Sequence, residues 1–147
     1  MVDFNFLSRT IQSTMTDPAS YYVPSTQQLI LEIFSADLKA THEFYTDVLD
    51  FKTIRTSPTF IVVQYEESQL YLCSDSHAPR PPAGTFAANI RIMVHDVDAV
   101  WERMRRLNVK PLLPIADRDY GLRDFTVAGP DGIAIRFGSR IPGMEEN

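Results

Sequence analysis

Residues 120–137 read YGLRDFTVAGPDGIAIRF, and this stretch predicts two strands joined by a tight turn. The motif Pro130-Asp131-Gly132 suits the turn, because proline presets φ and glycine adopts a conformation that other residues resist. Each strand has one apolar face, because apolar residues alternate at Phe125, Val127, Ile133, Ile135 and Phe137. The opposite face carries Asp124, Thr126 and Arg136. We expect this polar face to contact something other than the core.

The hairpin belongs to the second of two similar units. Each unit runs as one strand, a helix and three further strands, and Asp37 and Asp96 are suited to cap the two helices. These aspartates lie 59 positions apart (96 minus 37), and the strands before them align at the same offset. The expected first strands and helices cover residues 29–34, 37–49, 88–94 and 96–108. This internal repeat predicts two tandem βαβββ modules.

The two modules are expected to make one domain, residues 27–147, because a chain of this length builds one core of ordinary size. They cover residues 28–74 and 87–138, and the linker 75–86 between them is rich in proline. Residues 1–26 form an arm outside the repeat. A short helix there is one alternative and a loose arm is the other, since apolar residues fall at helical spacing at Phe4, Leu7, Ile11 and Met15.

The composition excludes several classes of protein. Apolar residues make up 44% and charged residues 22%, as in ordinary globular proteins, and the net charge of -5 argues against a nucleic-acid partner. No apolar run is long enough to span a membrane, and the N-terminus lacks the pattern of a signal peptide. Cys73 is the only cysteine, so no intrachain disulfide is expected. We expect a cytoplasmic protein.

Two segments resemble the vicinal-oxygen-chelate superfamily, also called glyoxalase/bleomycin-resistance/dioxygenase proteins. Residues 37–51, DLKATHEFYTDVLDF, resemble its first helix. Residues 120–132 resemble the Trp-Gly-x-Arg-Glu-Phe…Asp-Pro-Asp-Gly signature of the bleomycin-resistance branch. This chain differs from the signature by Tyr120 for Trp, Asp124 for Glu and Gly129 for Asp.

The resemblance covers residues 28–138 and implies an α+β fold. In this fold two tandem βαβββ modules form curved mixed sheets around a shared cavity, with the helices on the convex side. The resemblance also implies a homodimer in which each pocket is built from both chains. It places the chain closest to the metal-free, bleomycin-resistance-like branch.

Metal-dependent members of the superfamily hold a divalent ion with side chains from the first and last strands of both modules. The matching positions in this chain are Ile30, Tyr71, Asn89 and Arg136. Isoleucine cannot bind a metal, arginine carries a permanent positive charge, and asparagine is a weak neutral ligand. None of the histidines, at 42, 77 and 95, falls on a matched position. We therefore expect no metal and no cofactor.

Alternation along the strands predicts which side chains face the cavity. On the first strand Leu29, Leu31 and Ile33 belong under the helices, and their neighbours face in. Applied to the other strands, and with the hairpin included, the rule predicts ligand contacts at Ile30, Glu32, Phe34, Tyr71, Asn89, Arg91, Tyr120, Asp124 and Arg136. Tyr120 offers a stacking face. The carboxylates suit cationic groups and the arginines suit anionic ones, while the acidic net charge weakly favours a cationic ligand.

A structural role for the charged residues is the alternative. The repeat offset places Glu32 opposite Arg91, which suggests a central ion pair between them. Arg136 then has no partner unless Asp124 reaches it, so we favour a ligand contact for Arg136.

The function expected from these features is metal-independent binding of a small organic ligand in the concave cavity, such as sequestration of an antibiotic or toxin. One alternative is a metal-independent isomerase or lyase, with Glu32 as general base and Arg91 or Arg136 stabilising an enolate. A catalytically silent partner protein is another. If the strand register differs from this assignment, a metal-dependent glyoxalase- or dioxygenase-type enzyme remains.

Overall fold

A computed structural model of the chain describes residues 29–74, 81–82 and 84–144. The arm 1–26, with its alternative short helix, and most of the linker lie outside the described residues. The first module contains β1 (Leu31–Phe34), α2 (Leu38–Glu43), η2 (Phe44–Val48), β2 (Lys52–Ser57), β3 (Phe60–Tyr65) and β4 (Ser68–Cys73). The second module contains β5 (Ala88–Met93), α3 (Val97–Arg106), β6 (Pro111–Asp117), β7 (Leu122–Ala128) and β8 (Ile133–Arg140).

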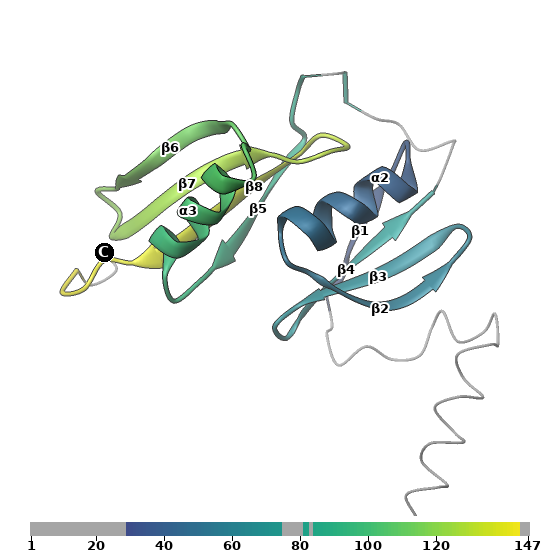
Figure 1. Cartoon of the computed structure of the whole chain (residues 1–147), viewed down its shortest axis with the longest axis horizontal. Helices are drawn as coiled ribbons and strands as arrows, with labels where there is room; N and C mark the ends of the chain where they lie inside the picture. The colour runs from purple at the N-terminus through teal and green to yellow at the C-terminus, as the bar shows by residue number, and fades with distance from the viewer. Residues whose placement is uncertain (1–28, 75–80, 83, 145–147) are drawn as a thin grey trace, which may run out of the picture.

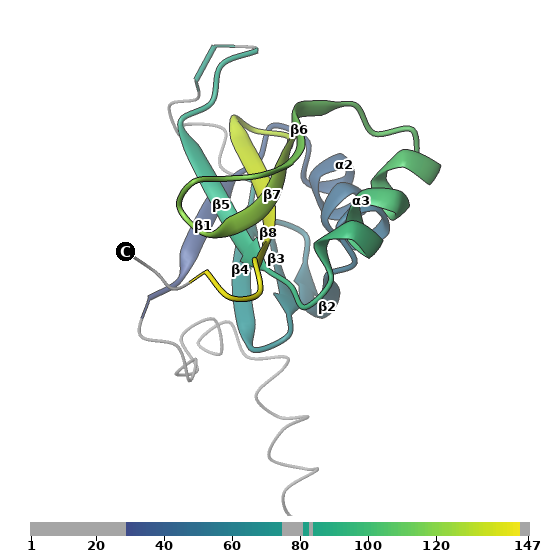
Figure 2. The same cartoon turned by 90° about the vertical axis from the view of Figure 1, so that its left-hand side faces the viewer.

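Each module folds into one four-stranded mixed sheet. The strand orders are β1-β4-β3-β2 and β5-β8-β7-β6, with the first strand of each module parallel to its last and the other pairs antiparallel. A helix connects the first strand of each module to the remaining three, as the return from a strand to a parallel partner requires. Both helices lie on the same side of the sheets (Figures 1 and 2). The predicted α+β fold of two βαβββ modules is confirmed.

The two aspartates that the repeat predicts as caps begin their helices. Asp37 accepts a hydrogen bond from the amide of Ala40, and Asp96 accepts one from the amide of Ala99, each at 3.0 Å. Such a cap supplies an acceptor to an amide that has no partner within the helix. The expected helix 96–108 is therefore observed as α3.

The first predicted helix, 37–49, differs from the expectation in its second half. It is α-helical only to Glu43 and continues as the π-helical turn η2, in which the amide of Leu49 bonds to the carbonyl of Phe44 at 3.2 Å. This wider turn holds the fully buried ring of Tyr45 edge-on against Phe44 and Phe51, at centroid distances of 5.7 and 5.3 Å. Aromatic packing therefore accompanies the departure from α-helical geometry.

The core lies between the helices and the helix-facing sides of both sheets. It contains Ile33 and Leu72 from the first sheet and Phe125 and Phe137 from the second, in one continuous cluster. Leu29 and Leu31, expected under the helices, are instead 88% and 41% exposed. This part of the prediction is wrong because β1 is an edge strand, and α2 packs on β4 and β3 rather than over its start.

Contacts on the helix side join the two modules. The carboxylate of Asp131, in the turn between β7 and β8, accepts hydrogen bonds from the amide of Ala36 at 3.0 Å and the hydroxyl of Thr41 at 2.5 Å. Figure 1 shows this turn reaching the start of α2. The predicted turn is confirmed, and its Asp131 adds a link to the first module that the turn motif alone does not predict. Asp131 has a φ of 61°, and Gly132 has a φ of +74°.

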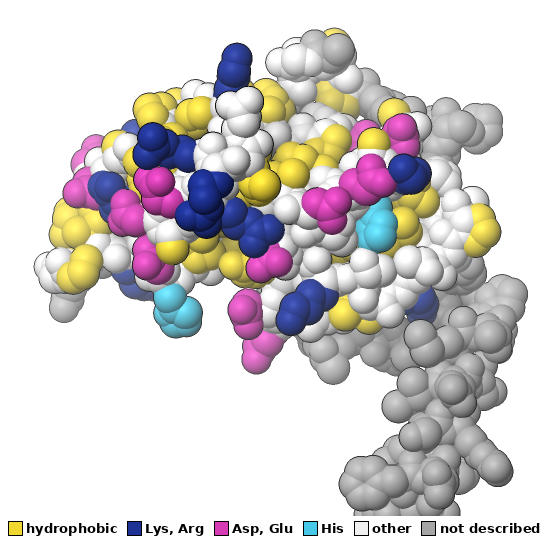
Figure 3. Space-filling view, in the orientation of Figure 1, with side chains coloured by type: hydrophobic (Ala, Val, Ile, Leu, Met, Phe, Trp, Pro, Cys, Tyr) yellow, Lys and Arg dark blue, Asp and Glu magenta, His cyan; other side chains and the backbone are white. Residues whose placement is uncertain are grey.

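The face that carries the helices is charged but of mixed sign. Lys and Arg side chains lie beside Asp and Glu side chains there (Figure 3), and pairs such as Lys39–Glu43 and Arg105–Glu102 span 2.8 and 3.0 Å. Such a surface lacks the single-sign field that tracks a phosphate backbone. Among the described residues, no helix has the length and apolar character needed to cross a membrane.

Candidate functional site

The concave face of the second sheet, on the side away from α3, gathers polar side chains from three strands. Arg91 of β5 lies opposite Arg136 of β8, and Arg136 lies opposite Thr126 of β7. Asn89 is two residues before Arg91, and Asp124 is two residues before Thr126. Because side chains alternate along a strand, all five share this face. The hydrophobic period that buries Phe125 and Phe137 on the other face therefore also sets the orientation of the polar residues.

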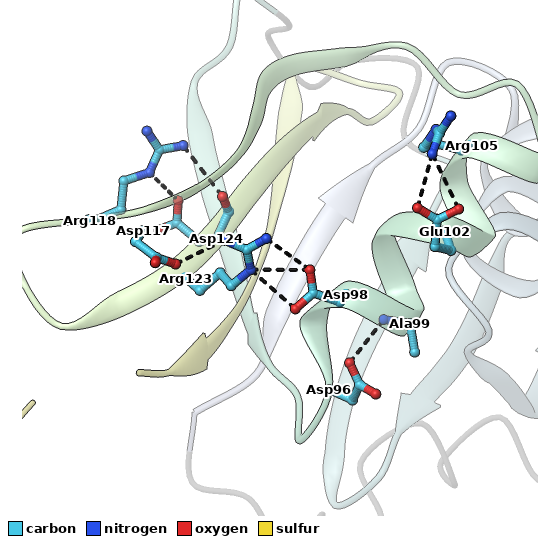
Figure 4. A network of polar contacts seen from close by, with 9 residues as sticks. All are labelled: Asp96, Asp98, Ala99, Glu102, Arg105, Asp117, Arg118, Arg123 and Asp124. Atoms are coloured by element: carbon cyan, nitrogen blue, oxygen red, sulfur yellow. Dashed lines mark hydrogen bonds and ion pairs between the residues drawn. The ribbon is translucent and has the colours of Figure 1, made fainter. Parts of the chain in front are cut away.

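Asp124 is a buried carboxylate that is compensated within the chain. Its side chain is only 1% exposed, and its two oxygens accept hydrogen bonds from Arg118 Nε at 2.8 Å and from the Tyr120 hydroxyl at 2.6 Å. Figure 4 shows Asp124 facing Arg118, whereas the neighbouring Arg123 turns toward Asp98 of α3. A buried charge persists when it is paired and hydrogen-bonded. The negative charge expected to attract a cationic ligand is thus already balanced by Arg118.

Tyr120 is held in place at its hydroxyl while its ring stays accessible. Burial raises the pKa of Tyr120, and the hydrogen bond to Asp124 raises it further, while the charges of Arg136 and Arg118 oppose this rise. The hydroxyl therefore stays a neutral donor. The side chain is 46% exposed, and the guanidinium of Arg91 lies 5.8 Å from the ring centroid. The ring forms a fixed apolar wall beside the arginines.

Arg91 and Arg136 are neighbouring positive charges. Arg136 Nε donates a hydrogen bond to the Thr126 hydroxyl at 3.2 Å, and Arg91 lies over Tyr120. Within the described part of the chain, neither arginine forms an ion pair with a carboxylate. The ion pair between Glu32 and Arg91 considered above is therefore not formed. The prediction is wrong because Glu32 lies on the first sheet and Arg91 on the second. Residues at equivalent positions of a repeat need not be close in space.

The predicted residues of the first module lie on the other sheet. Glu32 pairs in register with Tyr71, Glu32 and Phe34 are exposed, and Ile30 is half-buried. The buried Tyr71 packs edge-on against Phe60 at 4.9 Å. A single chain thus brings together five of the nine predicted ligand contacts on the second sheet or its border, and leaves four on the first. The five are Asn89, Arg91, Tyr120, Asp124 and Arg136.

Sequence reasoning missed Arg118. It lies in the loop between β6 and β7, where no period assigns a face, and yet it supplies the cation that Asp124 needs. The available signal was the prediction of an inward carboxylate, because a buried carboxylate requires a nearby cation. Arg118 lies six residues before Asp124 and is the loop residue that meets this requirement.

The four positions matched to metal ligands do not fit a divalent cation. Ile30 has no donor atom, and Arg136 places a positive charge beside that of Arg91. His42 bonds instead to the hydroxyl of Thr53 at 2.7 Å, on the first module. In the described ranges, no three His, Cys, Asp or Glu side chains gather closely enough to hold a metal ion.

Three cavities whose walls consist of described residues lie away from the predicted ligand contacts. Cavities of about 550, 400 and 280 Å³ lie among the described residues, and none is lined by a predicted ligand contact. The cavity of about 550 Å³ lies between the β3–β4 turn and the start of α3, with Tyr65, Glu66 and His95 in its wall. None of these three cavities includes Arg91 or Arg136.

Comparison with known proteins identifies the architecture. A sequence model of the Glyoxalase/Bleomycin resistance protein/Dioxygenase superfamily matches residues 27–137. A glyoxalase/bleomycin resistance protein/dioxygenase from Nocardioides superimposes with a TM-score of 0.70 at 20% identity, covering 97% of each chain. Lactoylglutathione lyase from Agrobacterium tumefaciens gives 0.61 at 18% identity, covering 79% of this chain and 95% of its own.

TioX from Micromonospora sp. ML1 gives a TM-score of 0.66 at 16% identity, covering 78% of this chain and 99% of its own. At these identities the likeness is one of fold. No curated protein sequence matches the chain.

Proposed function

Since the chain belongs to the glyoxalase/bleomycin resistance protein/dioxygenase superfamily, we propose that it binds a small organic molecule on the concave face of its second sheet, without a metal ion. The proposal places it with the bleomycin-resistance-like branch. Sequestration of a toxic compound, such as an antibiotic, is the corresponding role.

One observation carries this proposal: the position matched to a metal ligand on β8 holds Arg136, and it lies beside a second arginine and an exposed, anchored tyrosine ring. A ring to stack on and charged donors to orient a ligand are the usual parts of a small-molecule site. A cation placed there meets repulsion from both arginines.

The proposal includes pairing of two chains. Large apolar side chains are exposed on or beside the concave faces, including Phe34, Met93 and Leu113. A partner that covers such side chains removes apolar surface from water, which favours association. A second copy covering these faces would close the open site, so that each pocket is built from both chains.

Binding is favoured over turnover because Glu32 lacks the setting of a general base. It is exposed, and within the described residues no hydrogen bond or ion pair orients its carboxylate. A general base must be held within hydrogen-bond reach of the proton that it removes. The proposed site therefore needs no catalytic role for Glu32.

A ligand screen with a steric block tests the proposal. Small organic molecules of positive, negative and zero charge are screened by thermal shift, and hits are titrated by calorimetry. Asn89→Trp places a bulky neutral group on the concave face and should abolish binding, whereas Leu107→Trp, exposed beyond α3, should not. Binding by Asn89→Trp at wild-type affinity would contradict the proposed location. About one zinc, iron or nickel per chain in purified protein would contradict metal independence.

A further inference from the structure

We propose that the molecule bound on this face is an organic anion, with its carboxylate or phosphate held by both Arg91 and Arg136 and its apolar part packed on Tyr120. This inference rests on the proposed function and specifies the chemical class of its ligand. It reverses the weak preference for a cationic ligand that the net charge of -5 suggests.

The two guanidinium groups are placed to act together. Arg91 and Arg136 are register partners on adjacent parallel strands, and neighbouring strands lie about 4.8 Å apart. Both side chains point away from the helices. A guanidinium presents a planar fork of N–H donors that fits carboxylate and phosphate oxygens. Two such forks from neighbouring strands make a wide binding surface for a single anion.

Three carboxylates of the second module already have partners. Asp124 is bonded to Arg118 and Tyr120, and Asp98 and Asp117 are bonded to Arg123 on the opposite side of the sheet. The pair formed by Arg91 and Arg136 therefore lacks a counter-charge among the described residues. Like charges on adjacent strands repel, and a bound anion relieves that repulsion.

The arginines are also partly fixed before any ligand arrives. Arg136 uses Nε to bond the buried Thr126 hydroxyl, and its two terminal nitrogens donate no hydrogen bond to another described residue. Arg91 is held over the ring of Tyr120, whose hydroxyl is tied to Asp124. Side chains that are positioned in advance lose less conformational entropy on binding. These contacts favour recognition of a ligand over a general attraction for anions.

Three ring compounds of different charge provide the test. Benzoate, phenyl phosphate and benzylammonium share a ring and are titrated by calorimetry at low salt into the full-length protein. Benzoate, phenyl phosphate or both should bind, and which of them binds more tightly identifies the preferred anion. Benzylammonium should not bind. Arg91→Gln and Arg136→Gln should each weaken binding of the anion about tenfold or more. Their unfolding midpoints should be no lower than that of the wild type, because each variant relieves the repulsion between the two arginines. Arg106→Gln, exposed on α3, is the matched control and should keep wild-type affinity.

Two results would overturn the inference and leave the proposed function standing. One is that benzylammonium or a neutral compound binds more tightly than the anions do, that Asn89→Trp abolishes this binding, and that both arginine variants retain it. The other is that Glu32→Gln dissociates dimers and strengthens anion binding. That result would show that Glu32 of a second copy neutralises the charge of Arg91 and Arg136. If Glu32→Gln leaves both unchanged, the inference is supported. Absence of binding by compounds of every charge would remove the proposed function itself.

Discussion

Asp124 and Arg118 form a pair whose two members differ in their access to water. The Asp124 side chain is 1% exposed, and that of Arg118 is 26% exposed. A hydrogen bond to a charged group contributes about 1.5 to 3 kcal/mol, and the loss is larger when the group left behind is buried. Removing Arg118 leaves a buried charge behind and removing Asp124 leaves a partly exposed one, so the two substitutions should differ in their effect on the free energy of unfolding.

We expect Arg118→Ala to lower the free energy of unfolding by about 2 to 3 kcal/mol, because it leaves a buried carboxylate with Tyr120 as its remaining side-chain partner. Urea unfolding monitored by circular dichroism measures the change. Arg106→Ala removes an exposed arginine from α3 and should change stability by less than about 0.5 kcal/mol. Equal changes in the free energy of unfolding for the two variants would show that the pair of Arg118 and Asp124 stabilises the protein no more than an exposed arginine does.

For single residues, the sequence predicts the sheet face of a side chain better than it predicts the partner of that side chain. The faces of Asp124, Arg91 and Arg136 followed from the alternation of their strands. The partner of Asp124 did not, because Arg118 comes from a loop without a repeating pattern. Which arginine pairs with Asp124 depends on loop geometry that short-range patterns do not encode.

Among the elements, the π-helical turn η2 combines a wide backbone with a buried tyrosine. The ring of Tyr45 is fully buried, and no described residue provides a hydrogen bond to its hydroxyl. Burial raises the pKa of Tyr45, with a smaller contribution from the charge of Asp131. The folded protein therefore keeps the phenolic proton at a pH where the unfolded chain, with a pKa of about 10, has released it.

Tyr45→Phe should raise the free energy of unfolding by about 1 kcal/mol at pH 7, because it removes a buried polar group without a partner. The wild-type protein should lose stability as the pH rises above about 10, since the unfolded state then binds fewer protons than the folded state. Tyr45→Phe lacks this ionisable group and should lose less stability over the same pH range. The difference in free energy of unfolding between the variant and the wild type should therefore increase above about pH 10. Urea unfolding at pH 7 and above pH 10 measures both effects. A variant less stable than wild type at pH 7 would indicate a partner for the hydroxyl.

The sequence predicts the bounds of the helical segment formed by α2 and η2, but not the change from α-helical to π-helical geometry within it. Leu38, Thr41, Tyr45 and Val48 fall on one stripe of an α-helix, and the observed helical span, 38–48, agrees with this spacing. A π-helical turn differs by one residue in its hydrogen-bond spacing. The choice between the two depends on how Tyr45 packs with Phe51, which is a tertiary contact.

For the whole molecule, the link between modules at Asp131 is one of the contacts that a repeat does not predict. An internal repeat specifies each module, and it predicted both sheets and both helices. It contains no information on how one module docks on the other. Asp131 makes that connection from a turn of the second module to Ala36 and Thr41 of the first.

We expect Asp131→Asn to destabilise the protein by about 1 kcal/mol, because the amide offers one acceptor oxygen where the carboxylate uses two. Asparagine tolerates the positive φ of this position, so backbone strain does not confuse the result. Thr41→Val and the double variant complete a thermodynamic cycle measured by urea unfolding. The double variant should cost less than the sum of the singles. Strict additivity would show that the two side chains do not interact.

The same contact has a consequence for synthesis on the ribosome. Ala36 and Asp131 are 95 residues apart, so at about 5 to 20 residues per second roughly 5 to 20 s separate their translation. The first module is therefore made long before the carboxylate that bonds to the start of its helix. A nascent chain arrested before residue 131 should exchange the amide hydrogen of Ala36 faster than the released protein does. The turn between β7 and β8 therefore supplies these hydrogen bonds to the start of α2 only late in synthesis.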